Sequence, residues 1–308
     1  MTIIQREFSR QADKLAMAAL VRDFPAGNLH VTDLPYRLSS WALDDPANIG
    51  LWFDAGGRML AWAVLQTPFW TIDFAFHPEA DRNLRRQVWD WADQRAHGIL
   101  DTPYGHPAWF VNVFADQTET IRDLERVGFA SQADVDADAW SKVLLRCSVE
   151  VANPRVSLPA GFTIRPLAGV GEVEAYVELH RAVFESRNMT VEWRRCTLCQ
   201  PAYIPDLDLV AIAPNDRLAA FCVGWLRQDQ SGEISGQIEP MGVHADYRYL
   251  DLGRAILSEN LRRMHQYGAR QVFVETDSYR NPALALYVAA GFRVFREILV
   301  YRKDYSAG

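Results

Sequence analysis

The residues in this sequence whose types and spacing best suit chemistry run from Arg248 to Ala255, Arg-Tyr-Leu-Asp-Leu-Gly-Arg-Ala. They lie where an apolar strand pattern, Ile238–Val243, gives way to an amphipathic helix pattern. The first N–H groups of a helix have no intrahelical partner, and this end of the helix dipole is positive. Together with the flanking Arg248, these N–H groups predict a site for a diphosphate.

A second run, from Asn281 to Phe292, predicts a short helix that carries a tyrosine and ends in Gly-Phe. Between the two runs, Val272–Thr276 has the pattern of a buried strand. Tyr287 brings a phenol, whose ordinary pKa of about 10 suits an exchange of protons with a thiolate. The alternative is a tyrosine that packs its ring in the core and has its hydroxyl bonded.

The elements that must position these residues alternate between strand and helix patterns. Predicted strands cover Phe162–Pro166, Leu207–Ala213, Leu218–Trp225, Gln237–Val243, Val272–Thr276 and the region Phe292–Arg302. Predicted helices cover 171–185, Leu252–Tyr267 and 282–290, and residues 190–205 are irregular or helical. Pro240 lies inside a strand and cannot donate to its ladder, so we expect a bulge there.

A change in composition near residues 148–160 divides the chain into two domains, 1–152 and 156–308, with Asn153-Pro154 between them. The first domain repeats the order of the second: strands Met59–Gln66 and Thr71–Phe76, a helix, the strand Trp109–Phe114, and a run ending in Gly128-Phe129. Its turn, Asp81–Arg86, contains no glycine, and Leu124 stands where the second domain has Tyr287. We therefore expect a degenerate copy that is not catalytic.

In this order of elements the second domain resembles the GNAT acyltransferases over its full length. The tandem arrangement resembles two-domain bacterial GNAT proteins of the mycothiol synthase type. The resemblance implies an α+β fold of two tandem GNAT-like domains. Each would be a mixed α/β unit, a twisted and mostly antiparallel sheet flanked by helices, with a splayed central strand pair. It also implies acetyl-CoA as co-substrate and no metal.

The family's phosphate motif is Gln/Arg-x-x-Gly-x-Gly/Ala. Arg248 matches its first position and Gly253 its second glycine, whereas Asp251 replaces the first glycine and Tyr249 a common small residue. An aspartate there is unfavourable for a diphosphate unless its side chain turns away or caps the helix. The resemblance assigns the cofactor to Met241, Gly242, Val243, Arg248, Tyr249, Leu250, Asp251, Leu252, Gly253, Arg254, Ala255 and Asn281. Asn281 lies one residue closer to the tyrosine than the family's usual Asn.

The resemblance also implies the chemistry, which is acetyl transfer to the primary amine of a small molecule by direct attack in a ternary complex. Glu239 would accept the proton of the amine, with Glu275 as the weaker candidate, and Tyr287 would protonate the departing thiolate or hydrogen-bond its sulfur. A surface role for Glu239 stays open. Two other functions stay open as well, a non-catalytic acyl-CoA-binding regulatory module and a scaffold for protein contacts.

Composition and residue patterns argue against several other classes of protein. A net charge of −7 and the lack of a basic block argue against general nucleic-acid binding. No apolar run approaches membrane-spanning length, so we expect a cytoplasmic protein. Cys196 and Cys199 have no second pair to complete a zinc set, and His180 is expected to be a satisfied core residue. The sequence leaves open the amine, the length of the acyl group and a homodimer.

Overall fold

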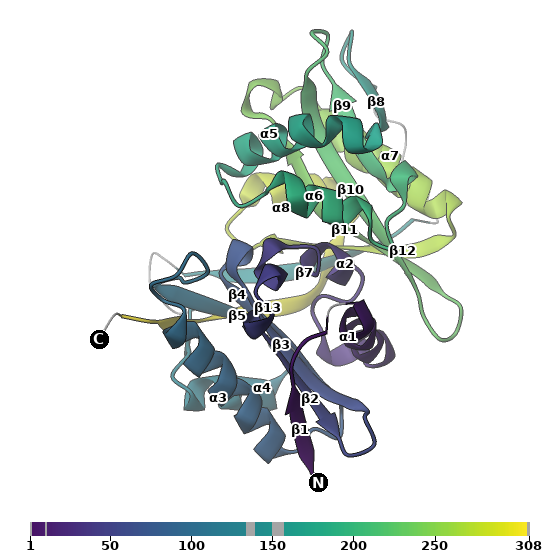
Figure 1. The fold of residues 1–308 in the computed structure, drawn as a ribbon. Coiled ribbons are helices and arrows are strands. Elements are labelled where there is room, and N and C mark those ends of the chain that lie inside the picture. Colours follow the sequence, from purple (N-terminus) through teal and green to yellow (C-terminus); the bar gives the residue numbers. More distant parts are fainter. Residues whose placement is uncertain (1, 10, 134–138, 150–156, 307–308) are drawn as a thin grey trace. The chain divides into compact units, whose positions relative to one another are not determined.

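The computed structural model describes residues 2–9, 11–133, 139–149 and 157–306, in two compact units (Figure 1). Unit 1 comprises Met1–Lys142 and Arg296–Gly308, and unit 2 comprises Val143–Phe295. The predicted second domain, 156–308, includes the C-terminal residues, whereas Arg296–Gly308 belong to unit 1. The reason is that residues Ile298–Asp304 of β13 (Arg293–Asp304) pair with β5 (Ala108–Phe114) of unit 1. The predicted linker Asn153-Pro154 lies outside the described residues.

Unit 2 is built on a mixed sheet. Its strands are β7 (Ser141–Ser148), β8 (Thr163–Pro166), β9 (Asp208–Ile212), β10 (Leu218–Gln228), β11 (Ile234–Val243) and β12 (Ala269–Asp277), in the order β7-β12-β11-β10-β9-β8. The pairs β8–β9, β9–β10 and β10–β11 are antiparallel, and β11–β12 is parallel. The predicted mostly antiparallel sheet is confirmed.

Helices cover both faces of this sheet (Figure 1). They are α5 (Val173–Phe184), α6 (Val191–Leu198), α7 (Leu252–Gln266) and α8 (Asn281–Ala289). Successive side chains of a strand point to opposite faces. In β10, Phe221 packs against Tyr176 of α5, whereas its neighbour Cys222 belongs to the core beneath α7 and α8. We call these two sides the α5 face and the α7 face.

The centre of the unit 2 sheet is splayed. Paired residues of β11 and β12 end at Ile238↔Val274, although both strands continue. Across β10, Met241 pairs with Cys222 and Ile238 with Gly224, so Glu239 and Pro240 together lie opposite one residue. This is a β-bulge, and the bulge predicted at Pro240 is confirmed.

Unit 1 has the same kind of architecture. Its strands run in the order β1 (Ile3–Arg6), β2 (Ile49–Asp54), β3 (Met59–Gln66), β4 (Thr71–Phe76), β5 and the C-terminal part of β13, with β6 (Ala130–Ser131) beside β13. Its helices are α1 (Gln11–Asp23), α2 (Leu34–Arg37), α3 (Arg82–Gly98) and α4 (Thr118–Arg126). The parallel strands β4 and β5 pair at Thr71↔Phe110, the counterpart of the splayed pair in unit 2.

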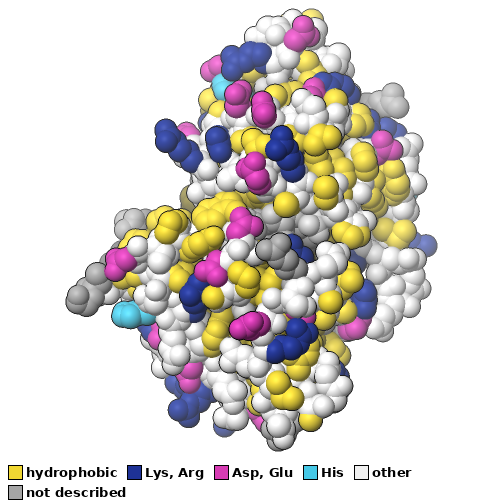
Figure 2. Space-filling model, viewed as in Figure 1, with side chains coloured by type: hydrophobic (Ala, Val, Ile, Leu, Met, Phe, Trp, Pro, Cys, Tyr) yellow, Lys and Arg dark blue, Asp and Glu magenta, His cyan; other side chains and the backbone are white. Residues whose placement is uncertain are grey.

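Among the described residues, no helix is long and apolar enough to cross a membrane. On the face that Figure 2 displays, basic and acidic side chains are interspersed over both units.

Candidate functional site

The predicted diphosphate turn links β11 to α7. A short 3₁₀ turn, Ala245–Tyr247, follows the strand, and α7 then begins at Leu252. Tyr249 and Asp251 have φ angles of 64° and 56°, in the left-handed region that favours glycine. The turn therefore forms without the family's first glycine, with the side chain of Tyr249 fully exposed.

The N-terminus of α7 is not capped by a side chain. Asp251 occupies the N-cap position but makes no side-chain cap hydrogen bond. A capping residue normally has an extended backbone, which lets its side chain reach the N–H groups ahead of it. With its left-handed backbone, Asp251 instead lies 3.6 Å from Nη1 of Arg254. It thus turns away, and the first amides of α7 remain for a ligand.

A groove of about 630 Å³ lies between this turn and α8, within the size range of small-molecule sites. It is lined by Val243, Tyr247, Arg248, Tyr249, Asp251, Leu252, Gly253, Arg254, Arg280, Pro282, Ala283, Ala285, Leu286 and Ala289. A Cβ on Gly253 would stand 3.4 Å from Leu286 and 3.5 Å from Val243, and so would narrow the groove. The groove, its arginines and the uncapped helix suit an acyl-CoA.

The groove gathers most of the predicted cofactor residues and adds a third arginine, Arg280, that the sequence analysis missed. Leu250 is exposed outside its lining, and Ala255 is buried inside α7. Asn281 is exposed at the start of α8, while its neighbours Arg280 and Pro282 line the groove. Nε of Arg280 lies 2.6 Å from Oδ2 of Asp277, at the end of β12. Arg280 lines the same groove as Arg248 and Arg254, a placement that only the fold reveals.

Tyr287 lies on α8, buried on the α7 face of the sheet. Its hydroxyl is 4.0 Å from Sδ of Met241, beside the splayed strands. Burial raises the pKa of this phenol, and the negative charge of Glu239 adds to the effect. Tyr287 therefore stays protonated at neutral pH.

Glu239 lies in the bulge of β11 with its side chain partly exposed. The indole Nε1 of Trp225, on β10, donates a hydrogen bond of 2.6 Å to its backbone carbonyl. Its carboxylate raises the pKa of Tyr287 and, on the α5 face, that of Tyr176. Along the chain, Glu239 directly follows Ile238, the last residue of β11 that pairs with β12, so its backbone lies where the two strands separate.

Trp225 packs against a tyrosine that belongs to a buried polar cluster. The ring of Tyr203 lies 6.5 Å from that of Trp225. The Tyr203 hydroxyl donates a hydrogen bond of 2.7 Å to Oδ2 of Asp208. Asp208 also accepts a hydrogen bond from Nη2 of Arg194, and both partners of this ion pair are fully buried.

The four cysteines divide into a buried pair and an exposed pair. Cys147 and Cys222 are buried, and burial raises the pKa of both thiols, to about 12 for Cys147. Cys196 and Cys199 are exposed at the end of α6. Among the described residues, no group of three or more His, Cys, Asp or Glu side chains could hold a metal ion.

Unit 1 has a turn that corresponds to the diphosphate turn of unit 2, but the helix after it is capped by a side chain. His77 Nδ1 accepts a hydrogen bond of 3.1 Å from the amide of Glu79, as His244 Nδ1 accepts one of 3.2 Å from that of Asp246. The helix that follows this turn in unit 1, α3, is capped by Asp81. Oδ1 of Asp81 accepts a hydrogen bond of 2.8 Å from the amide of Leu84. The amides that would bind a phosphate are thus already occupied in part.

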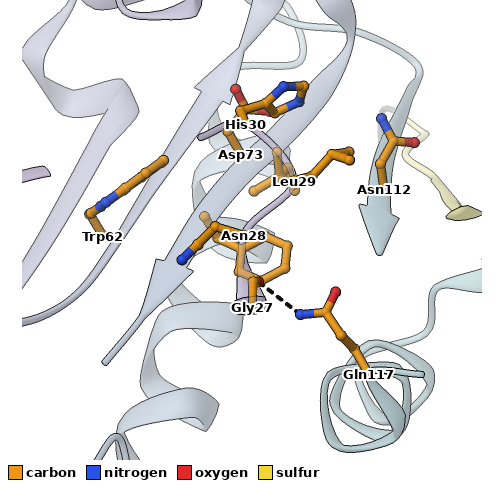
Figure 3. A pocket seen from close by; sticks show the side chains of 10 residues that line it. Gly27, Asn28, Leu29, His30, Trp62, Asp73, Asn112 and Gln117 are labelled. Atoms are coloured by element: carbon orange, nitrogen blue, oxygen red, sulfur yellow. Dashed lines mark hydrogen bonds between the residues drawn. The ribbon is translucent and has the colours of Figure 1, made fainter. Parts of the chain in front are cut away.

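The opening between β4 and β5 is also filled. Residues 27–30 enter it, and Nε2 of Gln117 donates a 2.8 Å hydrogen bond to the Gly27 carbonyl (Figure 3). A space of only about 20 Å³ is left. Asp73 on β4 forms a buried ion pair with Arg37, at 2.6 Å between Oδ2 and Nε.

Comparisons with known proteins agree with this geometry. The model of the Acetyltransferase (GNAT) family matches residues 173–292. A mycothiol acetyltransferase of Geodermatophilus obscurus is 27% identical over 164 residues, 49% of this chain and 52% of that protein. One of Segniliparus rotundus is 28% identical over 184 residues, 56% of this chain and 69% of that protein. The chain thus spans about half to two thirds of the length of these curated relatives.

Solved structures extend the likeness to the whole chain. A tandem GNAT protein from the clavulanic acid biosynthesis pathway has a TM-score of 0.68 at 15% identity and covers all of both chains. A GCN5-related N-acetyltransferase from Sphaerobacter thermophilus has a TM-score of 0.63 at 19% identity, with 99% and 96% of the two chains covered. The chain therefore has a tandem GNAT fold, and residues 173–292 of its second unit match the GNAT acetyltransferase family.

Proposed function

We propose that this protein is an N-acetyltransferase that moves an acetyl group from acetyl-CoA to the primary amine of a small molecule, in unit 2. The observation that carries the proposal is that the groove and the bulge of β11 lie along the same strand-to-helix segment, past the point where β11 separates from β12. The groove at the start of α7 is lined by the Tyr287 helix, and Glu239 lies in the bulge of β11 where that strand separates from β12. The cofactor would lie along the α7 face, and the amine would approach from the α5 face.

In this mechanism Glu239 takes a proton from the ammonium group of the acceptor, directly or through water. The amine nitrogen then forms a bond to the thioester carbon, the C–S bond breaks, and the nitrogen gives up its second proton to water, from which Tyr287 regains any proton that it donates. The electron pair leaves on sulfur, where the Tyr287 hydroxyl donates a proton or a hydrogen bond. The buried, protonated thiol of Cys222 supports direct attack over an acyl-enzyme.

The cofactor residues keep the roles that the resemblance gave them. The main-chain groups of Met241, Gly242 and Val243 would pair with the pantetheine arm along the unpaired edge of β11. The amides of α7 and the guanidinium groups of Arg248 and Arg254, together with that of Arg280, would hold the phosphates. Unit 1, with its capped helix and filled opening, would bind no acyl-CoA.

The test is acetyl transfer to a panel of primary amines, read by mass spectrometry of the acetylated product. A colorimetric thiol assay is unsuitable alone, because Cys199 is exposed and would react. We expect CoA release that depends on the amine. Binding of acetyl-CoA without transfer to any amine would instead favour a regulatory acyl-CoA-binding module. Failure to bind would favour a scaffold.

A further inference from the structure

Several buried polar atoms on the α5 face have no hydrogen-bond partner among the described residues. They are the Tyr176 hydroxyl, Nδ1 of His180, Nε and Nη1 of Arg194, and Oδ1 of Asp208. The prediction that His180 is a satisfied core residue is therefore wrong, because its ring stacks on Phe221, at 5.6 Å, while Nδ1 stays unbonded.

These side chains form one cluster. The guanidinium carbon of Arg194 lies 3.6 Å from the ring centre of Tyr176, and the rings of Tyr176 and His180 are 6.2 Å apart. Arg194 and Asp208 are joined as an ion pair. The four residues come from α5, α6 and β9, and we call them the acceptor-face cluster.

The cluster lies next to the proposed base. Tyr203 links the two, because its hydroxyl donates to Asp208 of the cluster and its ring lies 6.5 Å from that of Trp225, whose indole donates to the Glu239 carbonyl. Glu239 is partly exposed, whereas the four residues of the cluster are buried.

Buried polar groups are nearly always hydrogen-bonded, and an exception calls for an explanation. A phenylalanine at position 176 would fill the same space without leaving a hydroxyl unbonded. We propose that the acceptor-face cluster is the binding site for the polar end of the amine acceptor, and that this end is neutral and both donates and accepts hydrogen bonds. The proposal rests on the acetyltransferase function argued above.

The chemical class of this end follows from charge and from hydrogen-bonding roles. Asp208 already balances Arg194, and His180 is neutral because burial and the charges of Arg194 and Arg181 lower its pKa to about 3. The unbonded atoms include donors on Arg194 and an acceptor on Asp208. A hydroxyl or amide group can satisfy both. A carboxylate would be repelled by Asp208 and Glu239, and a second ammonium group by Arg194.

The first test is Tyr176→Phe in the full chain. We expect an unchanged or higher Tm, unchanged affinity for acetyl-CoA, and kcat/KM for the amine lower by about ten-fold, the value of one hydrogen bond. Tyr203→Phe is the matched control, because its hydroxyl has a partner in Asp208 and its loss should lower Tm. A lower Tm for Tyr176→Phe would reveal a structural role and overturn the proposal, as would an unchanged kcat/KM.

The second test compares 3-amino-1-propanol with propylamine and β-alanine. We expect the wild type to prefer the amino alcohol, and Tyr176→Phe to lose that preference. Equal or better use of β-alanine by the wild type would overturn the neutral class. Calorimetric titration of the amino alcohol into the CoA complex supplies a readout that needs no turnover. No transfer to any amine would contradict the proposed function, whereas binding that Tyr176→Phe leaves unchanged would contradict this inference alone.

Discussion

The indole N–H of Trp225 donates to the backbone carbonyl of Glu239 at 2.6 Å, across the bulge that interrupts the ladder between β10 and β11. A bulge leaves main-chain groups without their regular partners, and Pro240 offers no N–H of its own. A side chain on the neighbouring strand therefore supplies the missing donor. This hydrogen bond holds the backbone from which the Glu239 carboxylate projects.

Replacing Trp225 by phenylalanine should therefore misplace the base while keeping an aromatic ring against Tyr203. We expect kcat to fall by roughly ten-fold to a hundred-fold, because small displacements of a catalytic group are costly. The affinity for acetyl-CoA, measured by calorimetry, should not change. Trp109→Phe is the control, since its buried Nε1 has no partner among the described residues. Equal losses of activity in both variants would show that Trp225 only packs.

Replacing Tyr287 by phenylalanine should lower kcat by about 10²–10⁴-fold if the phenol acts as an acid. The hydroxyl is needed when negative charge develops on sulfur, so its loss should appear in kcat more than in the affinity for acetyl-CoA. Its contact with Met241 is long, at 4.0 Å, so Tm should change little. Steady-state kinetics with the best amine measures the effect. An unchanged kcat would reduce Tyr287 to a packing residue.

The role of Glu239 can be read from the pH dependence of the rate. For the wild type, kcat/KM should rise with pH and then level off, because the base must be ionised and the amine must lose its proton. Glu239→Gln keeps the size and removes the base. The variant should be slow near neutral pH and recover in part at high pH, where more amine is neutral. Wild-type rates from about pH 6 to about pH 9 would assign the base to water or Glu275, or leave the reaction to substrate orientation alone.

Local patterns in the sequence were enough to predict the turn at Gly253, the Tyr287 helix and the bulge at Pro240. Each of these depends on neighbouring residues along the chain, such as a proline inside an apolar strand. Strands β3 and β4 were predicted to the residue because Met59–Gln66 is an almost continuous apolar run and Thr71–Phe76 alternates, with Ile72, Phe74 and Phe76 on one face.

Features that depend on contacts between distant segments could not be predicted in this way. Arg280 reaches the groove only because α8 packs beside the start of α7, and Trp225 finds Glu239 only through the register of β10 and β11. The C-terminal strand joins unit 1 through its pairing with β5. His180 lies on an apolar helix face, and nothing in that pattern shows that Nδ1 stays unbonded.

The most direct test of the account is the stoichiometry of acetyl-CoA binding, measured by isothermal titration calorimetry. Gly253 lines the open groove of unit 2, whereas Asp81 caps the corresponding helix of unit 1. We predict one site per chain, lost in Gly253→Trp and kept in Asn83→Trp, the matched exposed position in the first turn of α3. Two sites per chain, no binding at all, or binding that survives Gly253→Trp would contradict the account.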